Sequence, residues 1–252
     1  METTLIKGLL VLEALVASNS PRGVTELAQE LGLMKSNVHR LLKTLAHQGY
    51  VRQDVETGRY RCSPKLWELG ARVSRNVEIV SVAKPAMTSL MQVTNETVHV
   101  AILDNNEVLY VGMMECPQPV RTFAQVGMRA PLYAVGTGKC MLAHLDPDTI
   151  RQILNDLQPC SPNTIVDPDA LSRELQNIRS RGYATNRAEW REGVGSVAAP
   201  IFDASLRVFA AIGVSGPLHR MTPERVKAFA PSVIEAAEAI SREFGYTSKK
   251  PA

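Results

Sequence analysis

The sequence predicts an α+β protein, in which short helices and a hairpin precede a larger domain built on an antiparallel sheet. Two observations support this prediction. Up to about residue 62, apolar residues recur at helical spacing and are followed by two short strand-like runs. From residue 97 onwards, hairpin patterns are mixed with helices instead of alternating strictly with them. We expect domains over residues 1–63 and 78–252, joined by a linker helix over 64–77.

The composition is that of an ordinary globular chain, with 252 residues and 45% hydrophobic content. Charged residues interrupt every apolar run before it reaches the roughly 18 residues that span a bilayer. The N-terminus lacks the residue order of a signal peptide, so we expect a cytoplasmic protein without membrane contacts. The cysteines, which contain no Cys-x-x-Cys pair, favour reduced thiols over zinc, and no metal or cofactor is expected. They are Cys62, Cys116, Cys140 and Cys160.

Three helices are expected before residue 50. Residues 3–17 carry apolar side chains at helical spacing, and Thr25 is expected to cap a short second helix that stops at Gly32. A third helix opens near Lys35 or Ser36. Its apolar stripe consists of Val38, Leu41, Leu42 and Leu45.

The second and third helices, with the glycine-containing turn between them, form a helix-turn-helix pattern. Polar residues that lie off the apolar stripe of the third helix are able to reach base edges and phosphates. The alternative interpretation is an ordinary helical hairpin with a polar outer face. The candidate DNA-contacting residues of this part are Thr25, Lys35, Ser36, Asn37, His39, Arg40 and Lys43.

A basic hairpin follows directly. Two short β-type runs, 50–53 and 59–62, enclose a loop in which Gly58 suits the left-handed position. A hairpin of this kind after a recognition-type helix is a wing, so the first domain is predicted to be a winged helix-turn-helix. Its arginines are expected to contact the DNA backbone or minor groove. They are Arg52, Arg59 and Arg61.

The larger domain is expected to open with a helix over about 78–94, followed by strands and helices in mixed order. Apolar alternation and turn residues predict strands over 97–103, 108–112, 120–126, 197–202 and 209–215. Helical spacing predicts helices over 150–157 and 170–181, with Gly182 as a stop, and a final helix that starts at Thr222-Pro223-Glu224.

Motifs for catalysis are weak. The Gly136-Thr137-Gly138-Lys139 run resembles the end of a phosphate-binding loop, but Tyr133 and Cys140 occupy the positions of the required glycine and hydroxyl residue. Cys140 and His144 would share a helix face, yet a buried, packed thiol is the commoner role for a free cysteine. We therefore expect no catalytic residue and no enzyme activity.

Three stretches resemble the IclR family of bacterial transcription regulators, and the resemblance covers nearly the whole chain. Residues 35–42 are similar to the family's recognition helix. The second stretch is 127–132, together with the Gly-Thr-Gly-Lys run that follows it. The third is 182–189 followed by 196–203, which matches the family signature except at Asn186, where the family usually has Asp or Ser.

The resemblance implies a GAF-like effector-binding domain, small organic acids as ligands, and dimers or dimers of dimers acting on a double-stranded DNA operator. It implies activation or repression without distinguishing them. The ligand site would use the backbone amides of Gly136 and Thr137. Its other positions would be Asn186, Ser196, Gly213 and Ser215, with Thr122 and Leu132 in the wall.

This sequence departs from carboxylate-binding relatives at three of these positions. Asn186 replaces an acid, Ser196 often replaces a cysteine, and Gly213 stands where some relatives have a serine. A small carboxylate remains the expected effector, but these changes leave the ligand class open. Each residue also has a purely structural interpretation, as a turn glycine or as a side chain that bonds neighbouring backbone.

Three classes of function therefore compete. The first is a ligand-responsive DNA-binding regulator, the second a small-molecule enzyme that kept a regulator's architecture, and the third a module whose winged helix contacts a protein. Between Lys35 and Arg61 there are six basic and two acidic residues. This local basic surplus suits a phosphate-contacting surface and favours the regulator.

Overall fold

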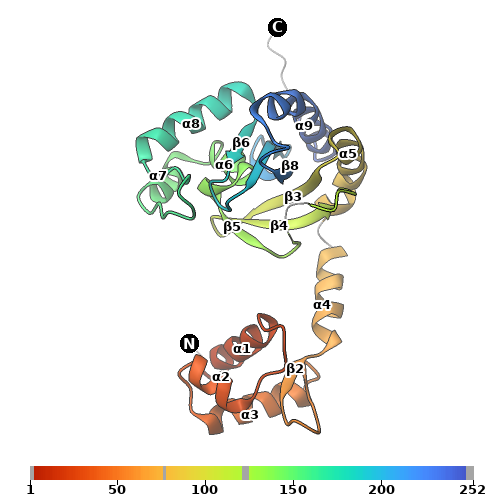
Figure 1. The fold of residues 1–252 in the computed structure, drawn as a ribbon, viewed down its shortest axis with the longest axis vertical. Coiled ribbons are helices and arrows are strands. Elements are labelled where there is room, and N and C mark those ends of the chain that lie inside the picture. The colour runs from red at the N-terminus through yellow and green to blue at the C-terminus, as the bar shows by residue number, and fades with distance from the viewer. Residues whose placement is uncertain (1–2, 76–77, 121–124, 248–252) are drawn as a thin grey trace. The chain divides into compact units, whose positions relative to one another are not determined.

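A computed structural model describes residues 3–75, 78–120 and 125–247 of the chain (Figure 1). The chain divides into two compact units, residues 1–76 and 77–252. Helix α4 (Pro64–Arg75), which the sequence places in a linker, belongs with the first unit by its contacts. Among the described residues, no helix is both long enough and apolar enough to cross a membrane.

The first unit contains the expected helix-turn-helix and wing. Its elements are α1 (Thr3–Val16), α2 (Val24–Glu30), α3 (Lys35–His47), β1 (Val51–Gln53) and β2 (Tyr60–Cys62), followed by α4. Val11, Leu27, Leu42 and Tyr60 are central to its core, which all these elements except α4 share. Tyr60 also exchanges two backbone hydrogen bonds of 2.8 Å with Arg22, which fastens β2 to the segment before α2.

The capping role that we expected for Thr25 is wrong. Helix α2 begins at Val24, and its N-cap is Gly23, two residues before the expected cap. The Glu26 side chain accepts a hydrogen bond from the backbone N–H of Gly23 at 3.2 Å, so a carboxylate three residues into the helix closes this end. The wing loop is as predicted, because Gly58 has a positive φ of 66°.

The second unit is built on a single sheet with strand order β5-β4-β3-β8-β7-β6, and every neighbouring pair is antiparallel. This confirms the α+β prediction with an antiparallel sheet. The strands are β3 (Thr97–Asp104), β4 (Glu107–Met114), β5 (Arg129–Pro131), β6 (Ala184–Arg187), β7 (Val194–Phe202) and β8 (Val208–Pro217).

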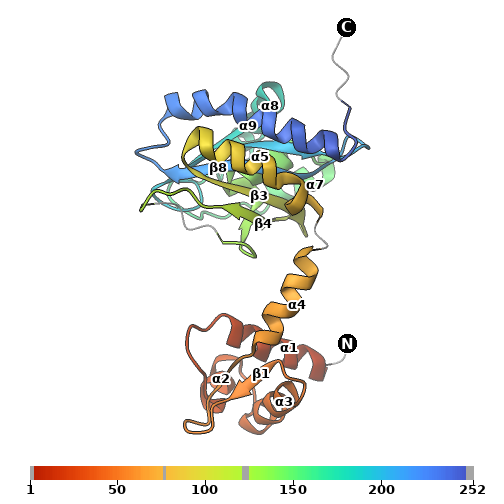
Figure 2. The same cartoon turned by 90° about the vertical axis from the view of Figure 1, so that its right-hand side faces the viewer.

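Helices cover both faces of this sheet and so form two cores. Helices α5 (Glu78–Thr94) and α9 (Pro223–Glu243) pack side by side on one face (Figure 2). The other face is covered by the turn η1 (Leu132–Ala134), α6 (Gly136–Leu142) and α8 (Pro168–Arg181), with α7 (Pro147–Leu154) beside them. Because side chains alternate along each strand, β3, β4, β7 and β8 each contribute residues to both cores, whereas β5 and β6 contribute to the core on the α6 side.

Two boundaries differ from the sequence prediction. At the described positions of the strand expected over 120–126, which are 120, 125 and 126, the chain is not in a strand; residues 121–124 lie outside the described residues. The helix expected over 150–157 is α7, which runs from Pro147 to Leu154. It starts earlier because Asp146 caps it by accepting from the backbone N–H of Thr149 at 2.9 Å, with Pro147 in the first turn.

Candidate DNA-binding surface and effector site

Helix α3 has one buried side and one polar side. Val38 and Leu42 are fully buried against the first unit, whereas the opposite side faces solvent. Among the residues singled out from the sequence, Asn37 is half-buried and receives a hydrogen bond of 3.4 Å from Arg40. The exposed ones are Lys35, Ser36, His39, Arg40 and Lys43. This side can present donors to base edges and phosphates without disturbing the core.

The wing brings two arginines directly opposite each other. Arg52 on β1 and Arg61 on β2 are cross-strand partners, and both side chains are exposed. Like charges in this position repel each other and destabilise a hairpin. Neither guanidinium forms an ion pair within the described part of the chain. A phosphate anion would relieve the repulsion, so the pair suits contact with a nucleic-acid backbone.

Arg59, the third arginine of the wing, already has intramolecular partners. Its guanidinium forms an ion pair with Glu26 at 2.6 Å and donates to the carbonyl of Pro21 at 2.9 Å. Glu26 belongs to α2, so this contact joins the wing to the helix-turn-helix. Thr25 lies beside Glu26 on the exposed side of α2.

In the second unit, four polar side chains form a row across the sheet. Asn186 on β6 is in register with Ser196 on β7, which is in register with Ser215 on β8, and Ser215 is in register with Thr97 on β3. All four side chains lie on or near the α6-facing side, and three of the expected effector residues are among them. Thr97 was not expected, because only the strand register shows that it continues the row.

The start of α6 is pressed against this row. A Cβ atom at Gly136 would lie 2.8 Å from the hydroxyl oxygen of Ser196, and one at Gly138 would overlap the backbone of Leu132. A Cβ at Gly213 would lie 3.0 Å from Ala198 Cβ and 3.2 Å from a methyl of Thr137. The serine that some relatives have at this position would therefore require these neighbours to shift by a few tenths of an ångström, and the absent side chain of Gly213 lets α6 approach the sheet closely.

Thr137 has an unusual environment for a hydroxyl. The residue is 1% exposed, and its hydroxyl makes no hydrogen bond of normal geometry within the described part of the chain. It lies near the phenol of Tyr110, where burial raises the pKa of Tyr110 and the Thr137 hydroxyl and the Arg191 charge oppose that rise. A buried donor without a partner costs about 1–3 kcal/mol, which a bound ligand would recover.

Asn186, in contrast, is held by its own domain. Its amide nitrogen donates to the Ala134 carbonyl at 2.5 Å, and its side-chain oxygen accepts from the backbone N–H of Glu189 at 3.4 Å. Both ends of the amide thus connect β6 with η1 and the following loop. Leu132, also in η1, is 1% exposed within the core. Thr122 lies outside the described residues.

Two of the cations that the sequence suggested for anion binding, Lys139 and Arg129, already have acidic partners. Lys139, 1% exposed, forms a buried ion pair with Glu189 at 2.5 Å, and burial raises the pKa of Glu189 while the Lys139 charge opposes that rise. A lysine engaged in this way is not free to bind phosphate, which removes the phosphate-loop interpretation. Arg129 is exposed and pairs with Asp104 and Glu107.

Cys140 is unsuited to nucleophilic chemistry. Its thiol is fully buried and contacts the Ala198 carbonyl at 2.9 Å, and burial raises its pKa to about 12. His144, the partner suggested by helical spacing, instead packs edge-on against Phe202 at 5.0 Å between ring centroids. Thiolates, not thiols, are the nucleophiles, so this cysteine is a packing residue.

Comparison with known proteins decides the family. The family model for the C-terminal domain of the bacterial transcriptional regulator IclR matches residues 71–242 of this chain. The family model for the IclR helix-turn-helix domain matches residues 4–55. The chain belongs to the IclR family. It is therefore a DNA-binding transcription regulator with an effector-binding domain, as its winged helix and its second unit already indicate, and the family's members are regulators and not enzymes.

Individual relatives match this chain along nearly its full length, in sequence and in fold. The chain is 38% identical over 240 residues to the HTH-type transcriptional regulator BhcR of Paracoccus denitrificans, covering 94% of this chain and 85% of that protein. The solved IclR of Thermotoga maritima matches with a TM-score of 0.81 and 32% identity, covering 98% and 100%. An IclR homologue of Microbacterium hydrocarbonoxydans, solved with 4-hydroxybenzoate, matches with a TM-score of 0.83 and 27% identity, covering 96% and 98%.

Proposed function

We propose that this regulator binds a specific, pseudo-palindromic operator, with one helix α3 per major groove and the wing on the adjacent backbone. The observation that carries the proposal is the division of α3 into a buried apolar side and an exposed side containing His39, Arg40 and Lys43. Base contacts from α3 supply specificity, and Arg52 and Arg61 supply contacts that do not depend on sequence.

The regulator is proposed to act as a homodimer, or as a dimer of dimers. Helix α1 supports this, because it is apolar on nearly all sides: Val11 and Leu15 face the core, whereas Leu5 is 62% and Leu9 50% exposed. A helix that is hydrophobic all round is normally buried on all sides. Its outer side is left for a second copy of the chain, since a two-fold operator requires two copies of α3.

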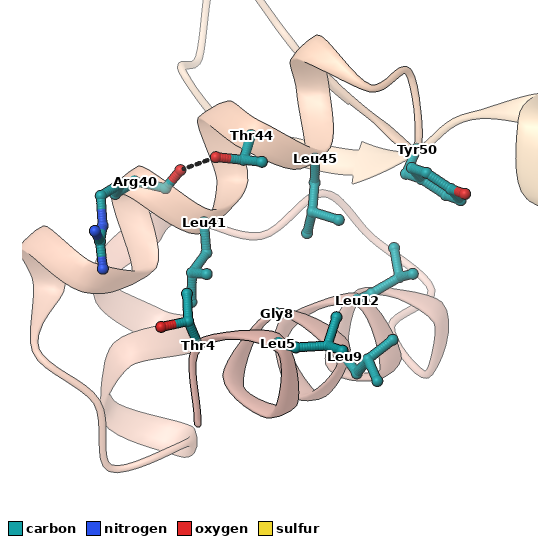
Figure 3. A pocket seen from close by; sticks show the side chains of 10 residues that line it. All are labelled: Thr4, Leu5, Gly8, Leu9, Leu12, Arg40, Leu41, Thr44, Leu45 and Tyr50. Carbon is teal, nitrogen blue, oxygen red and sulfur yellow. Dashed lines mark hydrogen bonds between the residues drawn. The ribbon is translucent and has the colours of Figure 1, made fainter. Parts of the chain in front are cut away.

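The exposed side of α1 lines a groove. It measures about 720 Å³, and leucines of α1 and α3 line it, with Arg40 at one end (Figure 3). Its apolar members are Leu5, Leu9, Leu12, Leu41 and Leu45. Because α3 forms one wall, a partner seated here would also fix the spacing of the two recognition helices.

The second unit is proposed to bind a small carboxylate between the start of α6 and the polar row. Support comes from the unpartnered hydroxyl of Thr137, which lies where the sequence places the ligand, and from the hydroxyls of Ser196 and Ser215 nearby. The relative solved with 4-hydroxybenzoate shows that a homologue takes a carboxylate. As a regulator acting on DNA, the protein is proposed to be cytoplasmic.

The test begins with selection of duplexes from a random pool by the full-length protein, followed by binding titrations with the enriched sequence. We expect a two-fold symmetric site bound by two chains. A Leu5→Glu/Leu9→Glu variant should be monomeric in analytical ultracentrifugation and should bind the full site weakly, whereas Gln29→Glu, a matched added charge on exposed α2, should remain dimeric. Enrichment of asymmetric sites, or a dimer that survives both glutamates, would contradict the proposal.

A further inference from the structure

Met34 lies in the turn of the helix-turn-helix, immediately before α3, and neither the sequence motifs nor the family resemblance assigns it to the DNA-binding surface. Its side chain is 76% exposed. The structure describes every residue from Val24 to His47, and Met34 is the one large apolar residue of that stretch that is exposed. A single exposed methionine is ordinary on a protein surface. This one, however, occupies a position that usually holds a polar residue.

Met34 is the N-cap of α3, with φ −67° and ψ 138°, and within the described part of the chain its side chain makes no capping hydrogen bond. Serine, threonine, aspartate and asparagine are preferred at N-caps because their side-chain oxygens accept from free N–H groups of the first turn. Asp146, Asp167 and Thr222 cap three helices of the second unit in this way. At Met34 the chain forgoes that stabilisation and exposes an apolar group instead, and such breaks of a local rule are typical of functional sites.

The backbone around Met34 is fixed on both sides. The N–H of Leu33 donates to the carbonyl of Ala28 at 3.0 Å, which ties the turn to α2. The carbonyl of Met34 accepts from the N–H groups of Asn37 at 3.0 Å and of Val38 at 3.1 Å, and Val38 is fully buried. A defined backbone therefore carries a side chain that is open to solvent, as a residue that contacts a partner requires.

The neighbours of Met34 indicate what that partner group is. Lys35 and Ser36 follow it at the start of α3, and both are exposed. In a helix-turn-helix, residues at the start of the recognition helix lie against base edges in the major groove. The apolar group that unmodified bases present there is the 5-methyl of thymine. A methionine side chain is long, unbranched and polarisable, so it adapts readily to such a group.

We propose that Met34 is a specificity-determining residue of the DNA-binding surface, and that its side chain packs against the 5-methyl group of one thymine in each half-site of the operator. This inference rests on the proposed binding of a specific operator and adds a base that each half-site must contain. Removing one methyl group from water favours binding by about fourfold. Cytosine and uracil lack this methyl group, so they would forfeit the contact.

Replacing thymine with deoxyuridine tests the proposal, because the change removes the methyl group and keeps the base pair. The full-length protein would be titrated with the duplex enriched from the random pool, in which each thymine in turn is replaced. We expect one position per half-site at which a single replacement weakens binding by about fourfold. For the Met34→Ala variant, the same replacement should change the affinity by less than about twofold.

Three variants separate methyl recognition from a structural role of Met34. Met34→Leu keeps an apolar side chain and should retain most of the discrimination between thymine and deoxyuridine. Met34→Ser supplies a capping hydroxyl, so it should raise the Tm of the first unit while losing the discrimination as Met34→Ala does. Val55→Ser removes another exposed apolar side chain of the same unit, at the tip of the wing, and should leave the discrimination unchanged.

The inference is overturned if no single deoxyuridine replacement weakens binding of the wild-type protein, or if Met34→Ala discriminates as strongly as the wild type. A loss of affinity in Met34→Ala that is equal for thymine and deoxyuridine duplexes would also overturn it, because the side chain would then contact the DNA backbone. Arg40→Ala, titrated on the same duplex, tests the proposed function separately. An operator whose binding depends on Arg40 but on no thymine methyl group would overturn this inference alone, whereas failure to enrich any duplex would overturn both.

Discussion

Removing the charge of Lys139 should show how much the buried ion pair with Glu189 contributes to the stability of the second unit. The Lys139 side chain is 1% exposed and that of Glu189 10%, and their charged atoms are 2.5 Å apart. Lys139→Met keeps most of the side-chain volume but leaves the Glu189 carboxylate buried without its counter-ion. Breaking such a pair costs about 3–5 kcal/mol of unfolding free energy. In a unit of this size, each kcal/mol lowers Tm by about 2–4 °C, so we expect a fall of about 6–20 °C.

The assay is differential scanning calorimetry of the full chain, in which the larger unit contributes most of the unfolding enthalpy because enthalpy scales with size. A Lys139→Met/Glu189→Met variant is the matched control. Replacing a whole buried pair with apolar residues is often neutral or stabilising, so the double variant should recover most of the lost Tm. A single variant within about 1 kcal/mol of wild type would refute the reasoning, because the pair would then be far better solvated than its burial indicates.

The pH dependence of the single variant has a definite sign. Burial already raises the pKa of Glu189, and Lys139→Met removes the charge that opposes this rise. A carboxyl whose folded-state pKa lies above its unfolded value stabilises the fold at pH below the unfolded value, and this contribution is lost as pH rises through the folded-state pKa. The Tm deficit of Lys139→Met should therefore be smaller at pH 5 than at pH 8. A larger deficit at pH 5 would contradict the assignment.

Three further expectations concern the DNA-binding surface and the thiols. Arg40→Ala should weaken binding to the selected operator by about 1–3 kcal/mol and relax its sequence preference, which titrations of operator and scrambled duplexes would detect. Arg52→Ala and Arg61→Ala should weaken binding to both duplexes alike and make the salt dependence shallower by about one per lost phosphate contact; a selective loss would show base contacts instead. Iodoacetamide at pH 8 should label exposed Cys160 but not Cys140 in the native protein, as peptide mass spectrometry would show, since burial raises the pKa of Cys140 to about 12.

Local patterns predicted the winged helix well. The apolar stripe of α3 identified its buried side, and Gly58 identified the wing loop, because both depend on residues close in sequence. The contact between Arg59 and Glu26 joins residues 33 positions apart, and no local pattern indicates it. The charge of Arg59 therefore suggested a free DNA-contacting arginine, whereas the fold gives it a second role in holding the wing against α2.

The arrangement of the proposed effector site could be predicted only in part, for the same reason. The family signature places Ser196 and Asn186 in the site, but only strand register aligns them with Ser215 and Thr97 and brings His99 next to Ser215. The one local signal for His99 is a histidine inside an otherwise apolar strand run. That pattern equally suits a histidine with ordinary core partners, so the sequence alone does not indicate that His99 lies next to Ser215.

The packing of α6 and the proposed recognition of a ligand depend on the same residues. Glycines at the start of α6 and at position 213 bring Thr137 onto the sheet, and this close approach buries its hydroxyl without a partner. In the part of the chain that the structure describes, only two buried side-chain oxygens lack a hydrogen bond, and the other belongs to Tyr60 in the first unit. A fold rarely keeps such a group without compensation, and functional sites are where local rules are broken. If the effector binds where we propose, its binding would offset the cost at Thr137, and ligand occupancy would then raise the stability of the second unit.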